Sequence, residues 1–187
     1  DDVDLLRLTF AKGGASVLAD AYLAAGSLTG GEATFAFAWG VLLQLADDLD
    51  DLQSDRNHGF VNPFLQAAKR EPLDGLTNRT FNFGQSVMKL MDKLPNGSEP
   101  FKQLLRRNST SLLIRAAAHS GELYTQKYLA ELETYSPLRF PFLKERQQQF
   151  TARAGSYTKI FEAFLSSGDD EPVFPALLCN RQNGQDG

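Results

Sequence analysis

Residues 40–55 show the clearest pattern of hydrophobic and polar positions in the chain. An α-helix turns by about 100° per residue, so residues three and four apart in sequence share one of its faces. The apolar residues of this stretch then form one face, which consists of Leu42, Leu45, Leu49 and Leu52. The acidic residues form another face, which consists of Asp47, Asp51 and Asp55. The pattern predicts a helix with one hydrophobic side and one acidic side.

Helical spacing continues along most of the chain, and no segment shows the sustained alternation that is typical of a strand. We expect helices over residues 15–25, 32–55, 63–70, 76–94, 99–134 and 143–165, separated by Gly- and Pro-containing turns. The first residues are expected to enter a helix midway, which Gly13 and Gly14 then interrupt, because an interior glycine costs about 1 kcal/mol. These elements predict an all-α bundle with one domain over residues 1–167 and a polar tail over residues 168–187.

Composition narrows the classes of partner. The chain has 187 residues and a formal charge of −4, which argues against a nucleic-acid partner because such proteins carry a basic face. Cys179 is the only cysteine, so no internal disulfide is possible and a reducing, cytoplasmic setting fits. Apolar runs stay shorter than the roughly 18 residues that indicate a membrane span, so no transmembrane segment is predicted.

The acidic side of the 40–55 helix is the candidate chemical site. Like charges four residues apart weaken a helix by a few tenths of a kcal/mol per pair, and a shared divalent cation would offset that repulsion. Mg²⁺ typically takes one or two carboxylates together with water and phosphate oxygens, and Asp47 and Asp51 lie one turn apart. Two alternatives remain: a solvated acidic face, or acidic residues favoured by a helix N-terminus. The spacing does not fit an EF-hand, which needs Gly at loop position 6.

Three other residues are candidates for binding or catalysis. Lys12, beside the glycine pair, could hold a diphosphate as a point charge, or it could be a solvent-exposed lysine at a kink. His58 precedes Gly59, a predicted helix stop, so we expect a C-cap histidine rather than a metal ligand. His119 has Glu122 nearby but no further ligand at helical spacing, so we expect a packed or surface histidine.

The acidic stretch of residues 40–55 resembles the second aspartate-rich motif of trans-isoprenyl diphosphate synthases. The positions in register are Gly40, Gln44, Asp47, Asp48, Asp51 and Asp55, with Lys12 upstream, and the resemblance covers residues 8–62. It implies the type I isoprenoid synthase fold, an all-helical bundle around a deep cavity. It also implies ionisation of an allylic isoprenoid diphosphate with Mg²⁺, in prenyl transfer or terpenoid synthesis.

The resemblance also implies residue roles. Asp47 and Asp51 would bind Mg²⁺ directly, and Asp48 would belong to the same metal site. Asp48 and Asp55 would also support the bound substrate. Lys12 would grip the diphosphate, and Gln44 would line the cavity beside the reacting end.

The chain departs from the family pattern in several respects, among them the lysine that follows the motif in the family, which the Arg56–Gly59 region replaces here. A first aspartate-rich motif on a facing helix is absent, and residues 63–187 carry no mark of the family. We expect a fragment that lacks the N-terminal helices. The alternatives are a chain that pairs with another as a homo- or hetero-oligomer, and a non-catalytic helical interaction or regulatory subunit. A catalytic site would place Asp47, Asp51 and Lys12 around one concavity, whereas an interaction surface would leave them apart and open.

Overall fold

The computed structural model describes residues 4–149, and these residues form helices and connecting turns without any strand. The expected all-α class is therefore confirmed for this part of the chain. The chain divides into two compact units, Asp1–Glu145 and Arg146–Gly187, and the helices α1 to α7 belong to the first. Every helix among residues 4–149 is too short or too polar to cross a membrane.

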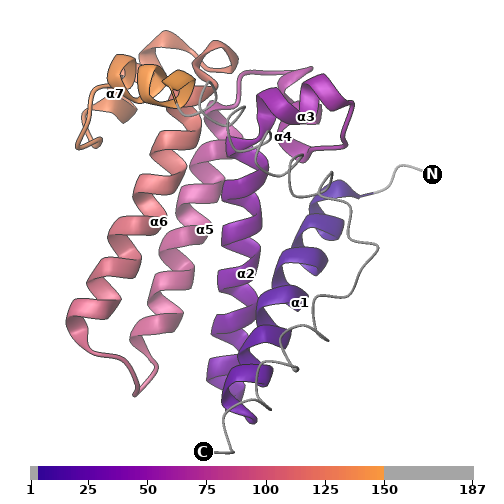
Figure 1. The fold of residues 1–187 in the computed structure, drawn as a ribbon, viewed down its shortest axis with the longest axis vertical. Helices are drawn as coiled ribbons and strands as arrows, with labels where there is room; N and C mark the ends of the chain where they lie inside the picture. Colours follow the sequence, from indigo (N-terminus) through magenta and orange to yellow (C-terminus); the bar gives the residue numbers. More distant parts are fainter. Residues whose placement is uncertain (1–3, 150–187) are drawn as a thin grey trace, which may run out of the picture. The chain divides into compact units, whose positions relative to one another are not determined.

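Four long helices run alongside one another, and the shorter helices gather near one end of them (Figure 1). The long helices are α1 (Leu5–Ala25), α2 (Gly30–Asp50), α5 (Asp74–Asp92) and α6 (Glu99–His119). The shorter elements are α3 (Leu52–His58), α4 (Pro63–Ala68), the 3₁₀ turn η1 (Gly121–Leu123) and α7 (Gln126–Glu133). A further helical segment begins at Phe140 and reaches residue 149.

Helix α2 is the centre of the unit, because it packs against α1, α5 and α6. The four leucines of its predicted hydrophobic face, which continues into α3, are between 0% and 4% exposed. They join a core that includes Phe64 of α4, Val87 of α5 and Leu113 of α6. The expected hydrophobic side is thus confirmed, and its burial holds the acidic side in a fixed direction.

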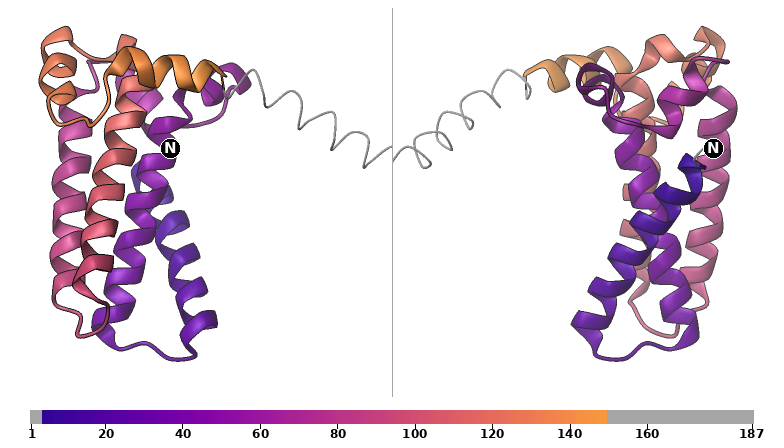
Figure 2. Two further views of the ribbon diagram at one scale, coloured as in Figure 1. Left: turned by 60° about the vertical axis from the view of Figure 1, so that its left-hand side comes forward. Right: turned by 90° about the vertical axis from the view of Figure 1, so that its right-hand side faces the viewer.

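The glycine pair near the N-terminus does not interrupt a helix, so that expectation is wrong. Helix α1 runs without a break from Leu5 to Ala25, and Gly13 and Gly14 are buried in it. Figure 2 shows α1 crossing α2, and Gly13 and Gly40 lie where the two backbones approach each other. A Cβ atom on Gly13 would lie 2.5 Å from the Cβ of Gln44. The glycines therefore permit a close helix crossing, and tertiary packing outweighs their poor helix propensity.

Two of the predicted helices are divided in the structure. The predicted helix 32–55 changes direction at Asp51, which ends α2 and begins α3 with φ −88° and ψ 6°. The expected helix 99–134 ends at His119, because Gly121–Leu123 forms a 3₁₀ turn and Thr125 caps α7 by accepting a hydrogen bond from the amide of Tyr128.

Several local signals are confirmed. Gly59 ends α3 in the left-handed conformation, with φ 70°. His58 is the last residue of α3 rather than its C-cap, and its Nδ1 atom lies 2.8 Å from the Ser54 carbonyl oxygen. Asn62 and Pro63 begin α4 as expected. The remainder of the predicted helix 143–165 and the boundary at residue 167 lie outside the described residues.

Candidate functional site

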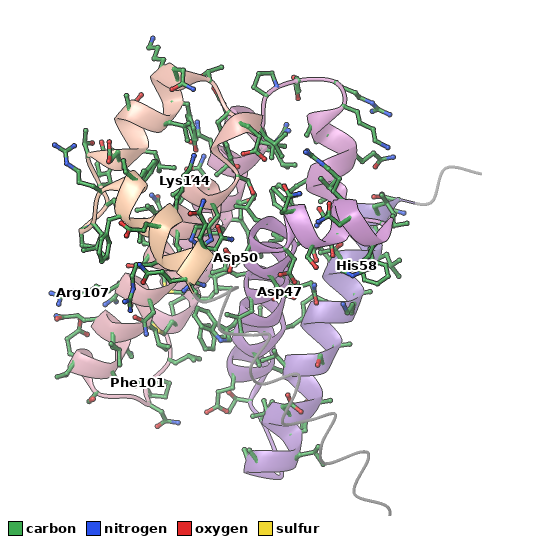
Figure 3. All side chains as sticks on the ribbon, turned by 45° about the horizontal axis from the view of Figure 1, so that its top comes forward. Asp47, Asp50, His58, Phe101, Arg107 and Lys144 are labelled. Atoms are coloured by element: carbon green, nitrogen blue, oxygen red, sulfur yellow. The ribbon has the colours of Figure 1, made fainter. Side chains whose placement is uncertain are left out.

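The acidic residues of the motif lie on the last turns of α2 and on α3. Asp47 and Asp51 are exposed, whereas Asp48 and Asp55 are half-buried. Asp47 and Asp50 lie close together in Figure 3, with Asp50 nearer to Lys144 and Asp47 nearer to His58. The hydrophobic side of α2 determines these directions, because burying Leu45 and Leu49 leaves Asp47 and Asp51 facing solvent.

Asp48 points toward α1 and is held by two neutral donors. Gln44 Nε2 donates to Asp48 Oδ1 at 2.8 Å, and Thr9 Oγ1 donates to Asp48 Oδ2 at 3.3 Å. Burial raises the pKa of Asp48, while the hydrogen bonds from Gln44 and Thr9 and the positive charge of Lys12 oppose that shift. Each carboxylate oxygen of Asp48 therefore accepts one hydrogen bond from a neutral side chain. Gln44 and Lys12 act on that same carboxylate.

Asp51 is surrounded by the other carboxylates of residues 47–55. Its pKa is raised first by partial burial and then by the charges of Asp47, Asp55, Asp50 and Asp48. All the charges that raise the pKa of Asp51 are carboxylates of the same acidic stretch. Asp47 lies one helical turn before Asp51, and both side chains are open to a ligand.

Asn62 is a part of the site that the sequence pattern did not single out. Its Nδ2 donates to the Asp48 carbonyl oxygen at 2.6 Å and to Asp55 Oδ2 at 2.7 Å. Its Oδ1 accepts the amide of Phe64 at 2.9 Å, which begins α4. Asn62 therefore ties the Asp55 side chain to the end of α2. An Asn-Pro pair at a helix start was the available signal, but only the fold brings it to Asp48.

Asp50 and Arg115 are also outside the predicted set. Asp50 Oδ1 lies 2.9 Å from His119 Nδ1, and Arg115 Nη2 donates to Asp50 Oδ2 at 3.3 Å. Burial acts to raise the pKa of Asp50, but the hydrogen bond from His119 and the charge of Arg115 outweigh it, so the pKa lies below its ordinary value. His119 is packed as expected, with 8% of its side chain exposed. The three side chains tie the end of α2 to α6.

A cavity of about 330 Å³ opens between α1, α2 and α6. Gln44, Asp47 and Asp50 line it from α2, and Arg115 lines it from α6. Asp47, Asp51 and Lys12 do not surround this cavity, so the arrangement expected of a catalytic site is not found here. Of the three, only Asp47 lines the cavity. Asp55 lines a different cavity of about 430 Å³, beside α3 and α4.

The described side chains do not make a metal site by themselves. Within residues 4–149, no three His, Cys, Asp or Glu side chains converge on one point. Mg²⁺ commonly uses only one or two carboxylates and completes its shell with water and substrate phosphates. Asp47 and Asp51 are an exposed pair of carboxylates one helical turn apart, which is the number of protein ligands that such binding uses.

Comparison of the chain with protein family models, with curated proteins and with solved structures gives no match.

Proposed function

We propose that the acidic end of α2 binds the diphosphate of an isoprenoid substrate together with Mg²⁺, as the resemblance to isoprenoid synthases implies. The observation that carries the proposal is that the aspartates of the motif differ in exposure and in hydrogen bonding. Asp47 and Asp51 are exposed one turn apart, while Asp48 is turned inward and fixed by Gln44 and Thr9. Such an arrangement supports a shared divalent ion and is of no benefit to a solvated surface helix, because like charges at this spacing repel.

Each residue would contribute a separate element of the chemistry. Bound Mg²⁺ would neutralise negative charge on the departing pyrophosphate and so favour ionisation of the allylic carbon–oxygen bond. Asp47 and Asp51 would hold the ion, and Asn62 would keep Asp55 beside them. Lys12 would add positive charge next to the diphosphate, since its charge already acts on Asp48. Gln44 would orient Asp48 and form part of the cavity wall.

Calorimetric titration of the full chain with Mg²⁺ and inorganic pyrophosphate tests this function. We expect binding that requires both components and that weakens by about tenfold or more in Asp47→Ala and Asp51→Ala, because each removes a charged ligand. Asp20→Ala, an exposed aspartate on α1, is the matched control and should leave binding unchanged. Failure of the wild-type chain to bind, with helical circular dichroism intact, would contradict the proposal.

A helical interaction subunit is a second candidate, and the exposed apolar side chains of α1 favour it. Leu8, Tyr22 and Leu23 are 59%, 45% and 85% exposed. Protein interfaces often centre on such residues. For a self-associating chain, light scattering would show a mass above that of the monomer, and Leu23→Glu would return the mass to the monomer value. A monomeric wild-type mass at all concentrations would count against association between copies.

A further inference from the structure

A second cavity meets the first one on α6. It also measures about 330 Å³, and it lies between α6 and residues 136–143. Leu112 and Arg115, which are one turn apart, line both cavities. The cavity with Asp47 and Asp50 and the second cavity therefore adjoin at the Leu112 and Arg115 side chains.

The two cavities differ in chemistry. The first is lined by side chains that bind charge, namely Gln44, Asp47, Asp50 and Arg115. The second is walled mainly by aliphatic side chains, namely Leu112, Ile114, Pro137, Leu138 and Leu143, with three small polar residues, Asn108, Ser111 and Ser136. Small-molecule sites usually occupy about 300–1,000 Å³ and combine an apolar wall with a few polar groups. Each cavity is near the lower limit, so a ligand that uses both would have a charged head and a hydrocarbon chain.

Arg115 lies where the two cavities adjoin, and its guanidinium group can bind the charged head of a ligand. Its side chain is 46% exposed, and one guanidinium nitrogen contacts Asp50 at 3.3 Å. A guanidinium has five N–H donors in a fork that matches phosphate oxygens, so this contact uses only part of its capacity. His119 holds the other oxygen of Asp50 at 2.9 Å, so Asp50 keeps a partner if Arg115 turns toward a ligand.

We propose that the two cavities form one site for an amphiphilic diphosphate, with Arg115 binding the diphosphate and the cavity beside Leu138 taking the hydrocarbon chain. This inference rests on the proposed function, since it assumes that Asp47 and Asp51 bind the same diphosphate through Mg²⁺. It adds a binding residue on α6 and a location for the chain that determines substrate preference.

Calorimetry on the full chain with two probes tests the location of the hydrocarbon chain. The probes are geranyl diphosphate and inorganic pyrophosphate, each with Mg²⁺. Leu138→Asp should weaken the binding of geranyl diphosphate by about tenfold or more, because a charge in an apolar cavity is costly to desolvate. The same substitution should leave the binding of pyrophosphate unchanged. Leu104→Asp is the matched control on α6, because Leu104 is 52% exposed and Leu138 is 47% exposed. Leu138→Ser provides a milder change at the same position.

A second pair of variants tests the head. Arg115→Gln should weaken the binding of both probes by about tenfold, which is the usual effect of losing a hydrogen bond to a charged group. Arg115→Lys should restore part of the affinity, because it returns the charge without the fork. Arg107→Gln should change neither probe, because Arg107 lies away from Asp47 and Asp50 (Figure 3).

The possible results separate this inference from the proposed function. A wild-type chain that binds neither probe would overturn both. Suppose that the wild-type chain binds pyrophosphate, and that the ratio of the geranyl diphosphate affinity to the pyrophosphate affinity is the same in Leu138→Asp as in Leu104→Asp. That result would overturn only the site for the hydrocarbon chain. Unchanged binding of both probes in Arg115→Gln would remove Arg115 from the site.

Discussion

Asn62 connects three helices through one side chain that is 3% exposed. It reaches the Asp48 carbonyl of α2, the Asp55 carboxylate of α3 and the first amides of α4. Because both Asp48 and Asp55 belong to the acidic motif, the position of the motif depends on a residue outside it. Losing this side chain would remove a donor from the half-buried Asp48 carbonyl and the acceptor from two helix amides.

Asn62→Ala should therefore lower the free energy of unfolding by about 2–3 kcal/mol, the combined cost of a lost helix cap and a lost hydrogen bond to a charged group. Urea denaturation followed by circular dichroism measures the change. Asn57→Ala is the matched control, since Asn57 is exposed on α3 and its loss should change stability by less than about 0.5 kcal/mol. Equal effects of the two substitutions would show that the Asn62 network contributes little.

Asp51→Asn should stabilise the chain at neutral pH. The pKa of Asp51 is raised by burial and by neighbouring carboxylates, so the folded chain holds this proton more tightly than the unfolded chain does. Stability therefore falls as pH rises from the ordinary carboxyl pKa through the raised one, and the ionised group costs stability at pH 7. Asp51 is exposed and makes no side-chain cap bond, so only the charge is lost, for a gain of a few tenths of a kcal/mol.

Thermal denaturation at several pH values checks this sign. The gain from Asp51→Asn should vanish below the pKa of the carboxyl group and should shrink in high salt. The same Asp51 variant should lose Mg²⁺-dependent binding of pyrophosphate, so that a site residue costs stability while it serves binding. Destabilisation at pH 7 would mean that the repulsion is already balanced.

At the scale of elements, the crossing of α1 and α2 depends on small residues on both helices. A Cβ atom on Gly40 would overlap the Gly13 carbonyl oxygen and lie 2.8 Å from the Cβ of Val17. Gly40→Ala should therefore force the helices apart and lower the free energy of unfolding by about 1–3 kcal/mol, even though alanine favours the helix. Chemical denaturation measures this effect.

Gly75→Ala is the matched control for the crossing. Gly75 lies in α5, and an added Cβ atom would meet no heavy atom within 4 Å. The substitution should be neutral or stabilising by up to about 1 kcal/mol, because it reduces the freedom of the unfolded chain. If Gly40→Ala behaved like Gly75→Ala, the backbones of α1 and α2 would not be in close contact at Gly13 and Gly40.

For the whole unit, α1 is the element with the least burial among the long helices. Only Thr9, Gly13 and Gly14 are buried in α1, whereas seven residues are buried in α2, among them Leu42, Leu45 and Leu49. Local opening requires less free energy where fewer side chains are buried. We therefore expect α1 amides to exchange hydrogen faster than those of α2 by about tenfold or more in a mass-spectrometric experiment. Equal protection of the two helices would show that they open as one unit.

Periodicity alone was sufficient for the class of fold and for the direction of α2. The hydrophobic side of residues 40–55 has helical spacing and must be buried, so the acidic side had to face elsewhere. Local chemistry likewise indicated Gly59 as a helix stop and Asn62–Pro63 as a helix start. These features are determined by a residue and its close neighbours in sequence, which is why they could be read without the fold.

The tertiary structure decided the features that depend on distant residues. Gly13 and Gly14 look like a helix break, and only the approach of α2 at Gly40 explains a continuous α1. The sequence indicated the carboxylates Asp47 and Asp51, but it contained no sign that Arg115 and His119 meet Asp50, because 65 and 69 residues separate them along the chain. Helical spacing relates residues within one turn or two, whereas the packing of α6 on α2 brings the remaining groups to the site. The sequence thus determined which face carries charge, and the packing of the helices determined what that face meets.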